Sequence, residues 1–373
     1  GYGAFEGFVE DNAQWLEPYA LFMALKEHFE GRAWLEWPME FRFYEKAVET
    51  ELPGSVQDAA GKHSFAQYLF YGQWRRLREA ARERGVSIIG DIPIFVALDS
   101  ADVWQRPELF QLKKTGEPKA VAGVPPDYFA KDGQMWGNPL FDWEAHARED
   151  YDWWLRRLGA NFAAFDMVRL DHFRGFHNYW AIPNKPKPQA KDGAWEEGPG
   201  IGFFEAVREA MPEARLIAED LGLISDEVRE LRREAGLPGM AVLHFAFGGG
   251  NDNLYLPHNL ERNCVLYPGT HDNSTSVGWY NETDEQTRDH VRRYLRVSGE
   301  SMSWDLLRCG YAAVADLFVT PMQDLMSLGS EARMNTPGEA VGNWQWRYQP
   351  EEIDRVWRES AGYLKELKSL YRR

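Results

Sequence analysis

The first part of the chain carries its apolar residues with a helical period. Along Asn12–Phe29 apolar side chains recur every three or four positions, which predicts an amphipathic helix. A second helix is expected over Ser64–Arg84, with Ser64 as its N-cap and Gly85 as its stop. The aromatic-rich stretch Trp34–Val48 between them is ambiguous. We therefore expect residues 1–84 to form a helical insertion subdomain.

From Gly85 onward, short β-like runs alternate with amphipathic helical runs, the order typical of parallel βα units. The expected strands are Val86–Val96, Phe162–Leu170, Arg215–Ala218, Met240–Phe245, Cys264–Tyr267 and Asp316–Thr320. The expected helices are Trp143–Leu158, Phe203–Ala210, Asp226–Glu234, Glu285–Val297, Trp304–Val314 and one from Glu351 to the end.

This alternation predicts an α/β fold of the (β/α)8 TIM-barrel type, spanning residues 85–373. The count is about six βα units, whereas a closed barrel has eight. Either the sheet is open with six strands, or the first two strands are missing from this chain. The Pro-, Gly- and aromatic-rich region 97–142 is expected to be a large inserted loop after the first strand, where barrel enzymes build their active sites.

The charge balance narrows the partners. A formal net charge of −16 argues against nucleic acid and against an anionic membrane, because both are polyanions, and it is compatible with a neutral sugar. No apolar run approaches the length of about 20 residues that spans a bilayer. Two cysteines, Cys264 and Cys309, make neither a disulfide framework nor a zinc pattern, so we expect a cytoplasmic protein.

Aromatic residues give a first indication of the ligand. The chain has 16 Trp, 16 Tyr and 21 Phe, and aromatic faces pack against the C–H faces of sugar rings. Aromatic residues also fill hydrophobic cores, and this composition taken alone favours core packing over sugar binding.

Three acidic clusters follow three of the expected strands. They are Arg169-Leu170-Asp171-His172, Ala218-Glu219-Asp220 and Thr270-His271-Asp272-Asn273. Alternation along a strand places Arg169 and Asp171 on one face, so that the guanidinium can hold the carboxylate ionised. Each acid alone is more often a helix cap or a surface residue, but three at successive strand ends favour a site.

Such a cluster suits the chemistry of glycosidic bonds. A retaining mechanism needs an ionised carboxylate as nucleophile and a second carboxyl that first donates and then accepts a proton. The negative charges of Asp171 and Asp272 are expected to keep Glu219 protonated near neutral pH. This chemistry needs no cofactor. His172 and His271 have no metal-ligand spacing around them, and Gly248–Gly250 lacks the Lys and Ser/Thr of a phosphate loop.

In these and other motifs, the chain resembles the amylomaltases, the 4-α-glucanotransferases or disproportionating enzymes of glycoside hydrolase family seventy-seven. The similarity is carried, in order along the chain, by Gly90–Ile94, Asp99–Trp104, Pro125–Phe129, Asp132–Gln134, Trp136–Leu140, Arg169–Gly175, Ala218–Gly222, Gly269–Asn273, Arg333–Gly338 and Asn343–Arg347. The related α-amylases would carry Asn-His where Phe95-Val96 stands.

The resemblance implies a role for each matched residue. It implies that Asp171 is the nucleophile, Glu219 the general acid/base and Asp272 the residue that holds the hydroxyls of the transferred sugar. It further implies the following substrate-binding set: Arg169 and His271 as supports of that subsite, His172 as a donor to sugar hydroxyls, Gln134 near the acid/base, Tyr128 and Phe129 as an aromatic lid, and Trp136, Asn335 and the weaker candidate Phe247 as sugar contacts. For Trp136 and Phe247 a core position is the alternative.

The resemblance also implies a transferase acting on malto-oligosaccharides and α-1,4-glucans. Members of the family begin with a further segment that carries the first two barrel strands, and nothing in this chain matches it. The chain is therefore expected to be truncated at its N-terminus, with a separate segment as a possible completing partner. Two other functions stay open: an α-glucan hydrolase, and a catalytically inactive glucan-binding fragment.

Overall fold

The computed structural model describes residues 2–126, 132–339 and 341–373, and these residues form two compact units. The first unit ends at Ala235 and the second begins at Gly236. Each unit has its own parallel sheet of three strands, so the described residues contain six parallel strands. The number agrees with the six strands expected from the sequence.

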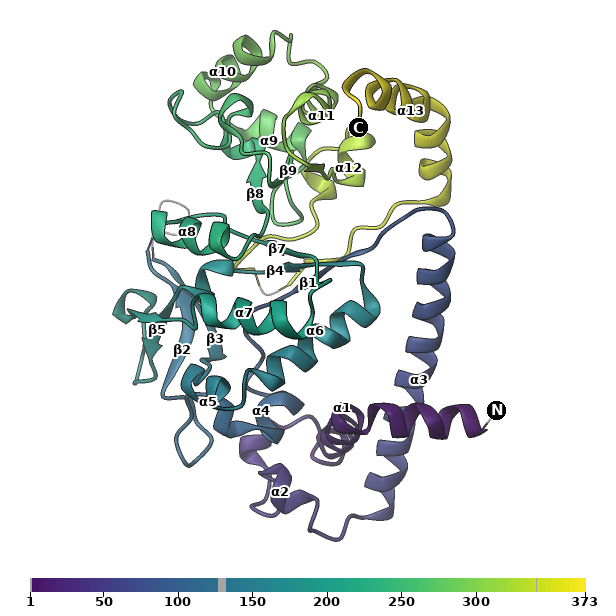
Figure 1. Ribbon diagram of the computed structural model, residues 1–373, viewed down its shortest axis with the longest axis vertical. Coiled ribbons are helices and arrows are strands. Elements are labelled where there is room, and N and C mark those ends of the chain that lie inside the picture. The colour runs from purple at the N-terminus through teal and green to yellow at the C-terminus, as the bar shows by residue number, and fades with distance from the viewer. Residues whose placement is uncertain (1, 127–131, 340) are drawn as a thin grey trace. The chain divides into compact units, whose positions relative to one another are not determined.

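Helices make up the first part of the first unit. The long helices α1 (Tyr2–His28) and α3 (Gly54–Arg82) pack against each other, and the short α2 (Tyr44–Ala47) lies between them in sequence (Figure 1). Aromatic rings fill the contact, for example Trp15 against Tyr71 with 5.5 Å between centroids. No strand occurs among the described residues before Ile89.

The parallel sheet of the first unit has the strand order β1-β4-β7. Its strands are β1 (Ile89–Ile92), β4 (Met167–Leu170) and β7 (Leu216–Ala218). Helix α6 (Asp152–Ala164) packs against β1 and β4, and α7 (Ile201–Ala210) and α8 (Asp226–Glu234) come before and after β7 (Figure 1). Every residue of β7 is buried, as expected for a strand covered on both faces.

A second, antiparallel sheet of the first unit has the order β3-β2-β5-β6. It is built from β2 (Ala120–Val124), β3 (Gln134–Pro139), β5 (Asn178–Pro183) and β6 (Ala194–Glu197). Helices α4 (Ala101–Gln105) and α5 (Trp143–Arg148) lie before and after β2 and β3 in sequence. The region 97–142 is thus not a structureless loop, because β2 and β3 pair with each other and β2 pairs with β5.

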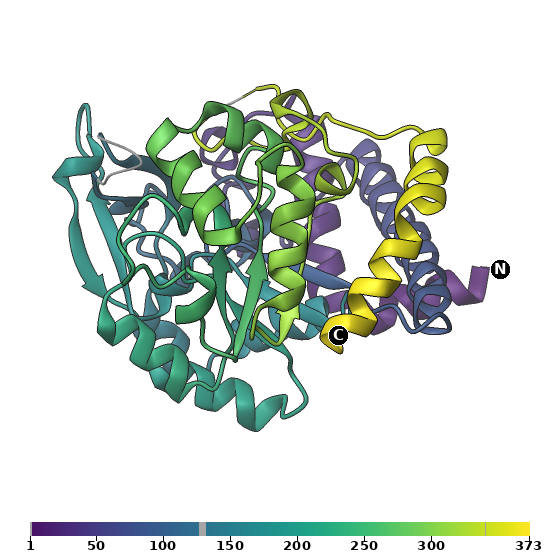
Figure 2. The ribbon, with the colours of Figure 1, turned by 90° about the horizontal axis from the view of Figure 1, so that it is seen from above.

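The second unit contains the parallel sheet β10-β9-β8. The strands are β8 (Gly239–Val242), β9 (Cys264–Tyr267) and β10 (Leu317–Phe318). The helices are α9 (Ser276–Glu282), α10 (Glu285–Leu295), α11 (Met302–Ala312), α12 (Met322–Leu325) and α13 (Pro350–Tyr371). Figure 2 shows α13 in yellow beside α11, which it contacts through Trp304 and Tyr363.

Several expected boundaries were wrong. The helix α3 begins at Gly54 after Pro53, so Ser64 lies inside it and is not its N-cap. The strand expected from Phe162 begins only at Met167, because Phe162 belongs to α6. A short apolar run fits a buried helix face as well as a buried strand, so periodicity could not separate the two.

Two further expected elements also end differently. The predicted helix Trp143–Leu158 is broken at Asp150 and Tyr151, whose φ angles of 52° and 58° interrupt the helical path. The strand β8 stops at Val242 and a turn of 3₁₀ helix follows it. The stop at Gly85 is confirmed: its φ is +68°, and the N–H of Val86 donates to the carbonyl of Ala81, which closes the end of α3.

No helix within the described part of the chain is long and apolar enough to cross a membrane.

The strand β1 depends on the absence of a side chain at Gly90. A Cβ atom there would lie 2.2 Å from the ring of Phe165, which follows α6. We expect Gly90→Ala to lower the free energy of unfolding by about 1–3 kcal/mol, because the ring must shift. Gly159→Ala is the matched control: it lies inside α6 with no atom near its added Cβ, and should stabilise by up to about 1 kcal/mol. Urea denaturation of both variants measures the effect, and a Gly90→Ala chain as stable as wild type would contradict this packing.

Candidate active site

Two acids follow directly from adjacent strands of the first unit. Leu170 at the end of β4 is paired in register with Ala218 at the end of β7, so Asp171 and Glu219 are the next residues along each strand. The N–H of Glu219 donates to the carbonyl of Leu170 at 3.0 Å. Because parallel strands end at one edge of the sheet, this register makes the two acids neighbours.

A tight turn after β4 completes the setting of Glu219. His172 has a left-handed backbone, with φ 52° and ψ 53°, and its N–H donates to Oε2 of Glu219 at 2.8 Å. The N–H of Leu221 donates to Oε1 at 3.0 Å. Both carboxyl oxygens of Glu219 are therefore held by the backbone.

Buried aromatic rings fix this turn from behind. Phe173 and Phe176 are fully buried, and they pack on Phe204 and Phe203 of α7 with centroid distances of 5.5 and 4.8 Å. The turn cannot move without disturbing this core, so the position of the backbone donors to Glu219 is tied to the packing of the unit.

Arg169 is the cation of the site. Only 7% of the residue is exposed, and its Nη2 lies 3.0 Å from Oδ1 of Asp171. Its Nη1 donates to Oδ2 of Asp91 at 2.5 Å, and Asp91 is the residue that faces it in register on β1. Burial by itself lowers the pKa of the Arg169 guanidinium, but the carboxylates of Asp171 and Asp91 outweigh burial and raise it.

Glu219 has a shifted pKa. Removal from water raises the pKa of Glu219 to about 7, and the negative charge of Asp171 adds to this effect. The guanidinium of Arg169 and the two backbone N–H groups act in the opposite direction. The side chain of Asp171 keeps 43% of its surface exposed and so can meet a substrate. The contribution expected from Asp272 stays a prediction.

Three further candidates of the first unit come together. The indole N–H of Trp136 donates to Oε1 of Gln134 at 3.1 Å, and the edge of its ring contacts His172 at 4.9 Å between centroids. Trp136 is 38% exposed, so its ring is available to a ligand. Burial, with a smaller effect of Arg174, lowers the pKa of His172 to about 4, so this imidazole is neutral at pH 7.

The third acid, Asp272, follows β9 in the second unit and has its own partners. Asn335 donates to Oδ1 of Asp272 at 2.6 Å, and Nε2 of His271 lies 3.4 Å from Oδ2. Arg333 donates to the backbone carbonyl of Asp272 at 2.6 Å. Trp344 packs on His271 with 5.3 Å between ring centroids. Asp272, His271 and Asn335 thus form one group of polar side chains.

The remaining candidates have different surroundings. Phe247 is 2% exposed and packs among Trp279, His290 and Tyr294 in the core of the second unit. The core position accounts for this ring, and a sugar contact stays a prediction. Tyr128 and Phe129 lie outside the described residues. Among the residues that are described, no three His, Cys, Asp or Glu side chains are grouped as metal ligands.

Sequence reasoning missed several residues that hold the site together. Asp91 was detectable, because it precedes the end of β1 as Arg169 precedes the end of β4. Arg174 lies within the matched motif Arg169–Gly175 but was assigned no role. It donates to the carbonyl of Leu223 in the loop after Glu219, and its guanidinium lies 3.9 Å from the ring centre of Trp195. Arg333 and Trp344 lie within matched motifs but were assigned no role.

A carboxylate paired with an arginine, beside a carboxyl whose pKa is raised, suits the cleavage of glycosidic bonds with retention. The comparisons with known proteins identify the family. The chain belongs to the 4-alpha-glucanotransferase family, whose model matches residues 2–353. The resemblance inferred from the sequence motifs is thereby confirmed.

Relatives and solved structures agree with this assignment. The 4-alpha-glucanotransferase of Thermus thermophilus is 47% identical over 358 residues, which cover 94% of this chain and 71% of the relative. That of Synechocystis is 43% identical over 373 residues, covering 99% and 73%. The structure of amylomaltase from Streptococcus agalactiae in complex with acarbose matches with a TM-score of 0.92 at 37% identity, covering 99% of this chain and 74% of the other. The mixed α/β fold of an amylomaltase is confirmed.

The raised pKa of Glu219 has a consequence for stability. A carboxyl whose pKa is higher in the folded chain binds a proton on folding, so its stabilising effect is lost as the pH rises from 4.5 to about 7. Glu219→Gln cannot ionise and escapes this loss. The free energy of unfolding of the variant, minus that of wild type, should therefore grow by about 1–3 kcal/mol between about pH 4 and pH 8.

Urea denaturation at each pH measures this difference. The exposed Glu205 on α7 supplies the control, because Glu205→Gln should show no such trend. If the free energy of unfolding of Glu219→Gln minus that of wild type stays constant with pH, the surroundings of Glu219 do not raise its pKa.

Proposed function

We propose that this chain is a 4-α-glucanotransferase that works by a retaining double displacement, with Asp171 as nucleophile and Glu219 as general acid/base. The observation that carries the proposal is the contrast between two neighbouring acids: Asp171 is ion-paired with Arg169, whereas the pKa of Glu219 is raised to about 7. One acid is thus ready to attack and the other to donate a proton at neutral pH.

The first step cleaves the donor glucan. An oxygen of Asp171 attacks the anomeric carbon and forms a glycosyl ester, while the proton of Glu219 passes to the leaving glycosidic oxygen. In the second step the 4-hydroxyl of an acceptor glucan attacks the same carbon. Its proton returns to the carboxylate of Glu219, the ester bond breaks, and the α-1,4 bond is formed with retention.

Other side chains orient the substrate in this scheme. Asp272 grips the hydroxyls of the transferred sugar, with Asn335 and His271 as its partners. On the acid/base side Gln134, Trp136 and His172 offer an amide, an exposed ring and a neutral imidazole. Tyr128 and Phe129 are assigned to the lid by the sequence resemblance alone.

Transfer rather than hydrolysis is supported by the relatives, which are named 4-alpha-glucanotransferases, and by the amylomaltase whose structure holds acarbose. The substrates proposed are malto-oligosaccharides and α-1,4-glucans. For transfer to prevail, the acceptor must reach the glycosyl ester before water does, and an aromatic lid would serve this purpose.

The fold proposal goes with this function. We infer that the six parallel strands belong to a (β/α)8 barrel of which two strands lie in the part of the relatives that this chain does not match. Residues 1–84 would be a helical insertion, 85–373 the incomplete barrel, and 97–142 an insertion beside the active site. A cytoplasmic location stays a prediction.

Incubation of the chain with maltotriose tests the function. The expected products are glucose and a ladder of longer malto-oligosaccharides, resolved by size. Asp171→Asn should lower the rate by roughly 10⁴-fold or more, because the amide cannot form the ester. Asp58→Asn, on the exposed face of α3, is the matched control and should keep the wild-type rate.

The alternatives give different products. Shorter sugars alone would indicate a hydrolase, and binding of maltotriose without any product would indicate an inactive glucan-binding fragment. Full activity of Asp171→Asn would exclude Asp171 as the nucleophile.

A further inference from the structure

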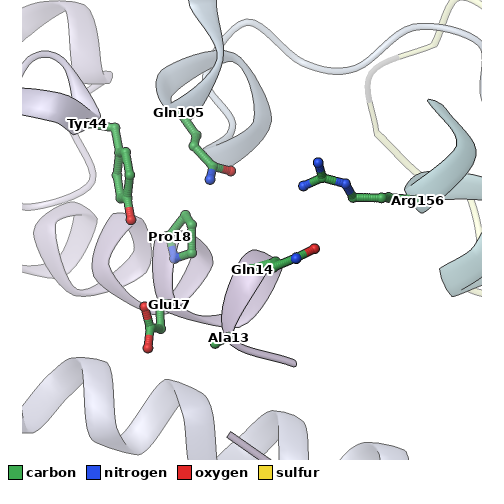
Figure 3. Close-up of a pocket in the computed structure, with 7 residues that line it drawn as sticks. All are labelled: Ala13, Gln14, Glu17, Pro18, Tyr44, Gln105 and Arg156. Carbon is green, nitrogen blue, oxygen red and sulfur yellow. The ribbon is translucent and has the colours of Figure 1, made fainter. Parts of the chain in front are cut away.

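The first unit has a cavity that takes no part in the proposed reaction. It has a volume of about 330 Å³ and opens among the helices α1, α2, α4 and α6 (Figure 3). Its lining consists of Ala13, Gln14, Glu17, Pro18, Tyr44, Gln105 and Arg156. It shares none of these residues with the group around Asp171 and Glu219, which lies at the ends of β4 and β7.

A proline inside α1 removes one helical hydrogen bond beside the cavity. Pro18 has no N–H, so the helix cannot satisfy the carbonyl of Gln14 four residues earlier. Gln14 and Pro18 both line the cavity. A carbonyl that has lost its helical donor can accept a hydrogen bond from the hydroxyl group of a ligand.

Tyr44 forms an aromatic wall of the same cavity. Its ring packs at a steep angle against the buried Trp104, at 5.3 Å between centroids, and Figure 3 shows its hydroxyl directed toward α1 near Pro18 and Glu17. Burial, together with the charge of Glu17, raises the pKa of the Tyr44 hydroxyl. The hydroxyl therefore stays protonated and keeps its ability to donate.

The other lining groups fit a neutral ligand rich in hydroxyls. The amides of Gln14 and Gln105 each donate and accept, and Glu17 is an acceptor. Arg156 is the lining cation, and its charge is already paired with Asp152. An anion such as phosphate would compete with that carboxylate, and a lipid tail would leave these polar groups without hydrogen bonds.

We propose that this cavity binds one or two glucosyl rings of an α-1,4-glucan, away from the reacting acids. The ring of Tyr44 would pack on the C–H face of a sugar, while the carbonyl of Gln14 and the side chains of Glu17 and Gln105 bind its hydroxyls. The choice of an α-1,4-glucan as ligand rests on the proposed function, whereas the polar and aromatic lining of the cavity is independent of that function. Such a site holds a long glucan to the enzyme between successive transfers.

A maltotriose analogue with sulfur in place of its glycosidic oxygens tests the proposal, because the enzyme cannot consume it. Its binding to the full chain is measured by equilibrium dialysis. Tyr44→Ala and Gln105→Ala should each weaken one class of binding site by about tenfold or more, through loss of the aromatic wall or of hydrogen bonds. Gln73→Ala, an exposed glutamine on α3, is the matched control and should bind as wild type does.

Two variants are used because Tyr44 also packs on Trp104, whereas Gln105 can be truncated without touching the core. If neither variant alters binding, or if the wild-type chain does not bind the analogue, the proposal is wrong. If Tyr44→Ala weakens binding of the analogue, but the wild-type chain makes no transfer products, only the proposed function is contradicted. If the wild-type chain makes transfer products, but the two variants bind the analogue as tightly as it does, only this inference is contradicted.

Discussion

The candidate active site depends on one buried cation. The guanidinium of Arg169 is almost fully enclosed, and a buried charge is tolerated only when opposite charges and hydrogen bonds compensate it. Asp91 and Asp171 supply this compensation from either side along the sheet edge. Asp171 is thereby placed in direct contact with a positive charge. Arg169 also lowers the pKa of Glu219. This effect is smaller than the rise caused by removal from water and by the negative charge of Asp171. Asp171 is thus paired with the buried cation, whereas burial and the charge of Asp171 raise the pKa of Glu219.

The strand register and the packed turn fix the positions of these charged side chains. The parallel register of β1, β4 and β7 brings Asp91 opposite Arg169 and places Asp171 and Glu219 one residue beyond a paired Leu170 and Ala218. Behind the sheet edge, Phe173 and Phe176 anchor the turn whose N–H groups hold Glu219. A site built on strand ends and a packed turn needs little rearrangement when substrate binds, which favours catalysis by preorganised charges.

Much of this could be read from the sequence, because the signals were local. The six strands were found from short β-like runs, and the contact of Arg169 with Asp171 followed from the alternation of side chains along β4. The antiparallel strands β2, β3, β5 and β6 were missed, since Gly123, Gly137 and Pro139 interrupt β2 and β3, and the pairing of β2 with β5 joins distant parts of the chain. Arg174 was missed for a similar reason: its contacts with Leu223 and Trp195 are tertiary and leave no periodic trace. Whether Phe247 was core or ligand contact could not be decided from residue type, because both uses need an aromatic ring.

The central claim is that Asp171, held ionised by Arg169, becomes covalently bonded to the sugar. The most direct measurement uses α-maltotriosyl fluoride with the Glu219→Gln variant, followed by protein digestion and mass spectrometry. Fluoride leaves without needing a proton, whereas the second step lacks its base, so a maltotriosyl ester should accumulate. The account predicts that the added mass maps to Asp171. A maltotriosyl group on another side chain would contradict the account, and so would consumption of the fluoride without any covalent adduct.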